Sequence, residues 1–191
     1  LAQRMKEEHV DTAPVADWDT KRRWQAEAFE RLEAAGYTVG SAYTAQRGAG
    51  TRFTYRDELW RGADLLGLGV SSFSHVGGVH FQNEPEFENY LARVERGERP
   101  LQRAYACSDE ERFVREFVLQ MKLGRVERGY FVRKFGIDPG QRFATELAAH
   151  RAGGHLEWDE REIRTTRTGL LRVDGLLWTF FPPHHRGPRY A

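Results

Sequence analysis

Cysteine, long apolar runs and an excess of charge are all scarce in this sequence of 191 residues. Cys107 is the only cysteine, so the chain cannot close an internal disulfide. One thiol also cannot build a zinc or iron–sulfur site, which takes several thiolates or thiolates with histidines. We therefore expect no metal ligands in this chain and a reducing, cytoplasmic setting.

Two further absences limit the partners. No apolar run approaches the roughly 20 residues that a membrane span needs, so we expect no membrane partner. The 29 basic and 28 acidic residues leave a formal charge of +1, far from the basic excess of a dedicated nucleic-acid binder.

The sequence starts without an initiator methionine, which suggests an excised domain or an incomplete reading frame. Its first residues, Leu1 to Glu8, do not form a signal peptide. What the sequence does contain is 40% apolar and 13% aromatic residues, enough to bury a core in one or two domains.

The N-terminal part reads as the tail of an α/β domain. Asp17 or Asp19 can cap a helix that runs to about Ala35 and is closed by Gly36. Residues 37–44 then read as a strand, with one further candidate strand at 65–72. A helix followed directly by a strand is half of a βα unit and implies a parallel sheet, whose other strands we expect upstream.

From Glu84 onward the pattern turns helical. We expect helices over residues 84–97, 112–123, 138–153 and 166–181, with a short hairpin from strands 155–158 and 162–165. Ser108 and Glu111 form a capping box, and Asp138-Pro139 is a strong helix start. One helix face should carry Phe113, Phe117, Gln120 and Met121. The succession of helix, helix, hairpin and helix resembles a winged-helix module.

Glycine and histidine supply the first candidate ligand groups. Gly67-Leu-Gly69-Val-Ser-Ser72 is a turn that lets the backbone approach a ligand, but the residues alone favour a tight structural turn. His75 and His80 could be metal ligands or a proton donor, and His184-His185 form a second pair in a proline-rich tail. Isolated histidines are usually neither, so we expect metal at neither pair.

Charged residues offer two more readings. Six groups of the helical part could touch nucleic-acid phosphates: Arg142, His150, Arg151, Arg161, Arg164 and Arg167. Interspersed glutamates such as Glu157 and Glu160 would repel the same backbone, so a solvated mixed-charge face is favoured. Asp57, Glu58 and Asp64 could act as acid–base groups, although carboxylates in polar loops are mostly solvated.

The run Trp60-Arg-Gly-Ala-Asp-Leu-Leu-Gly-Leu-Gly-Val-Ser-Ser-Phe-Ser-His75 resembles the segment that closes the barrel of oxygen-independent coproporphyrinogen III oxidases and their haem-chaperone and methyltransferase relatives. Other segments match the same family in order: residues 2–4, 32–37, 82–83, Tyr90, Pro100, the helix from Asp109, Phe135-Gly136 and 166–169. The resemblance therefore covers nearly the whole chain.

This resemblance implies a fold and its cofactors. Residues 1–83 would be the C-terminal end of a partial (β/α) radical S-adenosylmethionine (SAM) barrel, and residues 84–191 a helical, winged-helix-like domain. The family carries a 4Fe-4S cluster on a CxxxCxxC loop near its N-terminus, which this sequence lacks. The fragment alone should therefore be inactive. It would need the missing N-terminal barrel half and an electron donor such as flavodoxin or ferredoxin.

The resemblance also implies a cofactor contact. Phe73 matches an apolar position that touches cluster-bound SAM in the family, so we expect Phe73, with Gly67, Gly69 and Ser72, to contact this cofactor. An aromatic ring there could stack on adenine, although burial in the barrel wall is an equally physical use of it. No catalytic residue is assigned.

The substrate stays open. Ser41 to Arg47 does not carry the family's Asp-His-Phe pattern, and both Gly77 to Asn83 and Phe180 to Tyr190 look like a sister group. A porphyrin or haem-related substrate leads, followed by radical SAM methyl transfer on another scaffold. The rival readings are a winged-helix nucleic-acid-binding module and a haem-carrying protein without radical chemistry.

Overall fold

The first described helix, α2 (Trp18–Ala34), begins at its predicted cap. The Asp17 carboxylate accepts a hydrogen bond from the Thr20 backbone N–H at 2.7 Å, and Gly36, with φ of 81°, follows its end. This computed structural model describes residues 15–48 and 50–186. The family matches at residues 2–4 and at the C-terminal residues 187–190 lie outside the described residues.

Residues 37–47 form a hairpin. The prediction of a single strand over residues 37–44 was wrong, because β1 (Tyr37–Ser41) pairs antiparallel with β2 (Thr44–Arg47). Ser41 Oγ causes the reversal: it accepts the backbone N–H of Tyr43 at 3.1 Å and bonds Thr44 Oγ1 at 2.8 Å. All strand pairs in the described part of the chain are antiparallel, so the upstream parallel partners stay a prediction.

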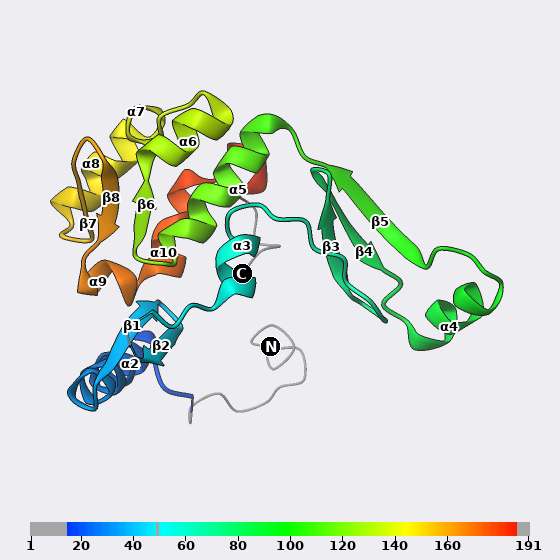
Figure 1. Ribbon diagram of the computed structural model, residues 1–191, viewed down its shortest axis with the longest axis horizontal. Coiled ribbons are helices and arrows are strands. Elements are labelled where there is room, and N and C mark those ends of the chain that lie inside the picture. The colour runs from blue at the N-terminus through cyan, green and yellow to red at the C-terminus, as the bar shows by residue number, and fades with distance from the viewer. Residues whose placement is uncertain (1–14, 49, 187–191) are drawn as a thin grey trace.

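A three-stranded sheet projects from the rest of the molecule, with α4 at its far end (Figure 1). Its strands are β3 (Phe73–Val76), β4 (Val79–Asn83) and β5 (Leu101–Ala106), in that order, and α4 spans Phe87–Glu95. We call residues 66–106 the arm. The prediction of a helix within 84–97 is confirmed. β4 and β5 lie on opposite sides of the predicted domain boundary at residue 83 and pair with each other. The boundary itself stays a prediction.

The second candidate strand over residues 65–72 was wrong. Only Leu65 forms a bridge, with His75, and the short helix α3 (Thr54–Leu59) precedes it. Gly69 (φ 97°) and Ser71 (φ 60°) adopt left-handed backbone conformations that interrupt any extended run.

The C-terminal region, residues 109–181, forms a packed unit that we call the body (Figure 1). Its elements are α5 (Asp109–Met121), β6 (Arg125–Glu127), α6 (Arg128–Phe135), α7 (Pro139–Arg142), α8 (Ala144–Ala152), β7 (Leu156–Trp158), β8 (Glu162–Thr165), α9 (Arg167–Leu170), α10 (Val173–Leu177) and η1 (Trp178–Phe180), followed by η2 (Pro183–His185). The three strands form one antiparallel sheet in the order β6-β8-β7.

Several predicted elements of the body are confirmed. Ser108 and Glu111 make the capping box, and the hairpin of β7 and β8 is present. Two predicted helices were wrong in extent. Phe143 (φ −115°, ψ 28°) divides the helix expected over 138–153, and Arg172 (φ −116°, ψ 7°) interrupts the one expected over 166–181.

Aromatic rings fill the centre of the body. Phe113, Phe117 and Met121 are fully buried and Gln120 is buried, which confirms the predicted face of α5. Their ring partners come from distant segments: the Phe117 ring centroid lies 4.7 Å from that of Phe143. Ala42 is the one member of this core cluster that comes from outside residues 113–180 in the described part of the chain. The core therefore belongs to the body.

A buried ion pair joins the body to the segment before the arm. Glu116, with a side chain 5% exposed, accepts hydrogen bonds from Lys134 Nζ at 2.7 Å and Tyr130 OH at 2.6 Å. Both donors also reach the Arg61 carbonyl oxygen at 2.8 Å. Gly62 is required beside them, since a Cβ there would lie 1.9 Å from Glu116 Oε1.

None of the described helices combines the length and the apolar character that crossing a bilayer requires.

Candidate functional site

The loop that contains Gly67, Gly69 and Ser72 is a tight turn built by the backbone. At Gly67 an added Cβ would lie 2.4 Å from the Phe73 carbonyl oxygen, so only glycine fits. The Gly67 N–H donates to Ser74 Oγ at 3.0 Å, and Asn83 Nδ2 donates to the Gly69 carbonyl at 2.9 Å. These bonds hold the loop against β3 and β4.

The loop presents apolar side chains to solvent. Leu68 is 83% exposed and Phe73 is 48% exposed, and Leu66 and Val70 are exposed as well. Ser72 Oγ donates to the Leu68 carbonyl at 2.6 Å, so its proton is used within the turn while its lone pairs can still accept. Three of the residues predicted to contact SAM, Gly67, Gly69 and Ser72, thus lie in one loop, and the fourth, Phe73, begins β3 directly after it. Their cofactor contact stays a prediction.

His75 and His80 face each other across β3 and β4, with ring centroids 6.2 Å apart. His75 is buried, and its Nδ1 has no hydrogen-bond partner among the described residues. Burial and the nearby Arg115 lower the pKa of His75 to about 4, and the same two causes lower the pKa of His80. Both imidazoles are therefore neutral at pH 7. The Phe73 ring stacks on His80 at a centroid distance of 5.5 Å.

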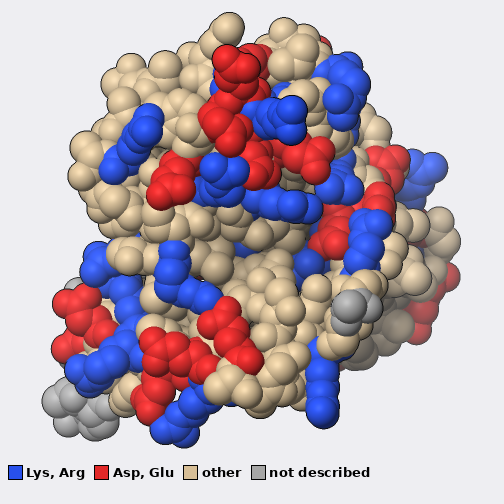
Figure 2. Space-filling view, turned by 60° about the vertical axis from the view of Figure 1, so that its left-hand side comes forward, with Lys and Arg blue, Asp and Glu red and all other residues tan. Residues whose placement is uncertain are grey.

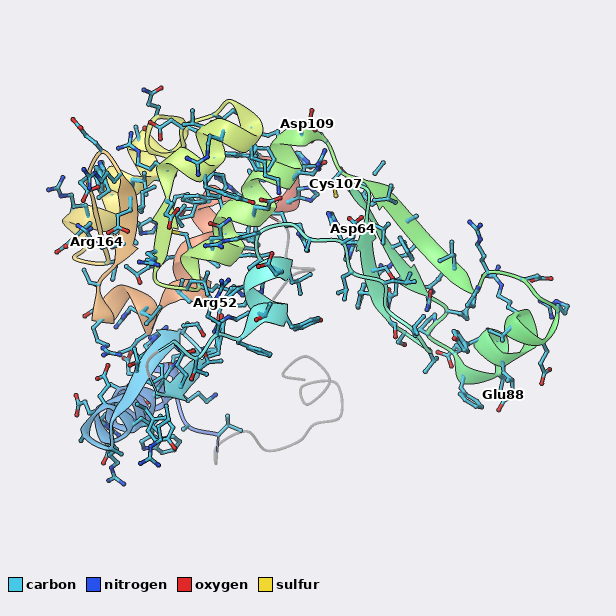
Figure 3. The ribbon with its side chains drawn as sticks, in the orientation of Figure 1. Arg52, Asp64, Glu88, Cys107, Asp109 and Arg164 are labelled. Carbon is cyan, nitrogen blue, oxygen red and sulfur yellow. The ribbon has the colours of Figure 1, made fainter. Side chains whose placement is uncertain are left out.

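A mainly apolar cavity of about 540 Å³ lies next to these histidines, between α3, β4, β5, α5 and the C-terminal segment. Its lining residues are Leu59, Trp60, His80, Tyr105, Cys107, Glu111, Val114, Arg115, Val118, Leu119, Phe181, Pro182 and His185. Cys107 lies where β5 joins α5 (Figure 3). Burial and the Glu111 carboxylate raise the pKa of this thiol, so it is not an activated nucleophile.

Glu111 meets the C-terminal histidine pair beside this cavity. Its Oε1 lies 3.3 Å from His184 Nε2 and 2.7 Å from His185 Nε2, and one ligand atom from each of the three residues lies within 4.8 Å of the others. Burial raises the pKa of Glu111, but hydrogen bonds from Tyr105, the Ser108 backbone and both histidines outweigh it and hold this pKa well below its usual range.

Sequence reasoning missed this group of three. Glu111 was identified only as a capping residue, and the histidines follow it by more than seventy positions, so no local spacing joins them. A carboxylate with two imidazoles is a donor set that a divalent cation can use. The expected absence of metal ligands stays a prediction.

Three of the five arginines that could touch nucleic-acid phosphates pair with carboxylates. Arg142 pairs with Glu110, Arg164 with Glu162, and Arg167 with Glu33. Figure 2 shows basic and acidic side chains interspersed over this side of the molecule. The arrangement is typical of a solvated mixed-charge face.

The three candidate acid–base carboxylates serve structural contacts. Asp57 accepts two hydrogen bonds from Arg56, and Asp64 accepts the Gly77 backbone N–H at 2.9 Å. Glu58 lies 3.7 Å from Arg52.

Comparison with known proteins identifies what the chain is similar to. No protein-family model matches it. It is 28% identical over 167 residues to an oxygen-independent coproporphyrinogen III oxidase of Pseudomonas aeruginosa, covering 79% of this chain and 36% of that protein. It is 25% identical over 190 residues to the enzyme of the same name from Thermostichus vulcanus, covering 91% of this chain and 58% of that protein.

A solved structure shares the fold. The structure described as "Coproporphyrinogen III oxidase (HemN) from Escherichia coli is a Radical SAM enzyme" matches with a TM-score of 0.67 at 22% identity, over 81% of this chain and 39% of that one. The chain thus spans between about a third and three fifths of the relatives that it matches, and it matches their C-terminal part. The similarity expected from the sequence is confirmed.

Proposed function

We propose that this chain is the C-terminal part of a radical SAM enzyme that acts on a porphyrin or haem-related substrate. The similarity to proteins named coproporphyrinogen III oxidases supports the reaction class. The observation that carries the proposal is the segment at residues 66–73, the loop and the first residue of β3. It lies in the segment that resembles the family's barrel closure, and it exposes four apolar side chains that a covering structure would bury.

The residues of this chain fit the proposed cofactors unequally. One cysteine, with a raised pKa, does not fit a 4Fe-4S cluster, so we derive no step through the cluster from these residues. The exposed Phe73 ring and the adjacent glycine backbone fit a contact with the adenosyl part of SAM. SAM, when bound to a reduced cluster, supplies a 5'-deoxyadenosyl radical. Within that scheme Phe73 positions the adenine and the loop excludes water from it.

Residues 84–191, which include the body, would serve as a cap on the barrel mouth. The order α5, β6, α6, α8, β7, β8, with sheet order β6-β8-β7, supports the winged-helix-like reading of this region. By covering the mouth it would keep water and oxygen from the radical. The proposal predicts that uncoupled SAM turnover changes when the cap is removed from the intact enzyme.

The test joins the chain to its cluster-bearing N-terminal part under anaerobic conditions, with iron, sulfide, SAM and dithionite, and measures 5'-deoxyadenosine. Phe73→Ala should raise the SAM concentration needed for half-maximal turnover about 2- to 10-fold, the equivalent of a lost ring stacking. Phe87→Ala, on α4 and 61% exposed, is the matched control and should leave it unchanged. An unchanged SAM dependence in Phe73→Ala would refute the contact.

Haem binding is a second candidate, favoured by one observation: His80 lines the apolar cavity of about 540 Å³. Its lowered pKa keeps the imidazole neutral and able to act as an axial ligand at pH 7. Haem added to the chain should give a Soret shift that is lost in His80→Ala and retained in His150→Ala, whose imidazole bonds Thr179 Oγ1 in the body. Equal spectra for both variants would exclude this site.

A further inference from the structure

A second cavity, of about 390 Å³, lies between the β1–β2 hairpin, α3 and β6, and it plays no part in the proposed SAM contact. Four arginines line it: Arg52, Arg56, Arg61 and Arg125. Figure 3 shows Arg52 near the hairpin, beside α3.

Positive charge is in excess in this pocket. Two carboxylates line the pocket with these four guanidinium groups, Asp57 and Glu127, and a third, Glu58, lies 3.7 Å from Arg52. Asp57 is already engaged: its Oδ1 accepts from Arg56 Nε at 2.9 Å and from Arg56 Nη2 at 2.7 Å. Among the described residues, neither Arg61 nor Arg125 has a side-chain ion pair. An anion in the pocket would compensate the charge of these two guanidinium groups.

An unsatisfied donor lies at the same place. Gln120 lines the pocket and is 4% exposed, and its Nε2 has no hydrogen-bond partner among the described residues. A buried amide donor without an acceptor is costly and rare in folded proteins. Rotation of the terminal amide would present this NH2 group to a ligand oxygen. It is a second observation, independent of charge, that points to an acceptor-rich ligand.

We propose that this pocket binds an oxyanion, the carboxylate or phosphate group of a small-molecule ligand. Guanidinium forks match the oxygen pairs of both groups, and the Gln120 amide adds a neutral donor to them. Arg61 and Arg125 supply the charge, while Arg56, held by Asp57 and by Thr44 Oγ1 at 2.6 Å, forms the fixed wall. The site is a property of this chain and does not depend on the radical chemistry proposed above.

Isothermal titration of the 191-residue chain with inorganic phosphate and with succinate, at constant ionic strength held by chloride, tests the proposal. Arg61→Gln and Arg125→Gln should each weaken binding about 10-fold, the loss of one charge-assisted hydrogen bond. Gln120→Leu should also weaken binding several-fold while leaving the melting temperature without ligand unchanged or higher, since an unsatisfied buried donor is removed.

Two further variants separate this site from misfolding and from general charge. Glu127→Gln removes an opposing carboxylate and should tighten binding a few-fold, a gain that misfolding does not produce. Arg99→Gln changes an exposed arginine outside the pocket and should have no effect. Saturable binding of either anion supports the site, and the preferred one identifies the ligand group. Absence of saturable binding by both, or equal weakening by Arg99→Gln, would overturn the proposal.

Discussion

The body and the arm differ in where their large apolar side chains lie. In the body, residues 109–181, two of these side chains are strongly exposed, Val132 and Trp178. In the arm, residues 66–106, the exposed ones are Leu66, Leu68, Val70, Phe73, Val76, Phe87, Leu91, Val94, Leu101 and Tyr105. Every residue of β5 is exposed. The body therefore buries nearly all of its large apolar side chains within itself, whereas the arm leaves many of them exposed to solvent.

This difference teaches which region needs more protein around it. Contiguous exposed apolar surface marks a place where another structure binds. The body has its own core, whereas the arm leaves its large apolar side chains for another structure to bury. That contrast agrees with a chain that matches only the C-terminal part of its relatives.

The largest expected effect is in the body core. Phe117→Ala removes a fully buried ring that contacts Phe143 and Phe180, and it should lower the free energy of unfolding by about 3–5 kcal/mol. Phe87→Ala in the arm removes the same type of side chain from a site that is 61% exposed. It should change the free energy of unfolding by less than about 0.5 kcal/mol. Urea unfolding of both variants measures this difference. Similar losses of stability in the two variants would contradict the distinction between body and arm.

Ion pairs should differ between the two regions in the same way. Glu116→Gln removes the charge from a nearly fully buried carboxylate and should cost about 2 kcal/mol, less than a fully buried pair because Lys134 is partly exposed. Arg96→Gln breaks the solvent-exposed pair with Glu98 in the arm and should give no measurable change in the urea midpoint. A larger effect from Arg96 than from Glu116 would contradict the account.

The junction of arm and body should depend on pH through His75. Its pKa is about 4 in the folded chain against 6.5 unfolded, so the unfolded chain binds more protons below pH 6.5. The stability contributed by neutral His75 is thus complete above pH 6.5 and is lost as the pH falls towards 4. Melting temperatures between pH 7.5 and 5 should fall less in His75→Gln than in the parent chain. Parallel curves would show that His75 is not the group responsible.

The smallest effect is expected at the tip of the loop. Leu68 is 83% exposed, so Leu68→Ala should change the free energy of unfolding of this chain by less than about 0.5 kcal/mol. If the proposed function is correct, the same change in the full-length protein should impair SAM cleavage, because the side chain would then be buried against the barrel. The pair of measurements sharpens the comparison: a strong destabilisation of the isolated chain would mean that Leu68 already packs within it.

Local signals predicted much of the fold. Ser108 was recognised as a helix cap, and Asp17 as one of two candidates, because a cap bonds to residues only two or three positions away. The hairpin of β7 and β8 and the buried face of α5 were found for the same reason, because each pattern is contained in a short stretch of sequence.

Contacts between distant segments were not predictable in this way. β5 was missed because its six residues are all exposed and show no alternation of buried positions. β6 has three residues and is defined by its pairing with β8. The candidate sites behave alike: the glycine turn was visible in the sequence, but the group of Glu111 with two histidines and the arginine pocket each join residues from separated segments.

The sequence of the coding DNA upstream of Leu1 tests the central claim most directly. The account predicts an open reading frame that continues upstream and encodes a CxxxCxxC motif, which would supply the barrel half that covers the arm. A stop codon shortly upstream, with translation starting near Met5, would contradict it, because the exposed apolar loop would then belong to a complete chain.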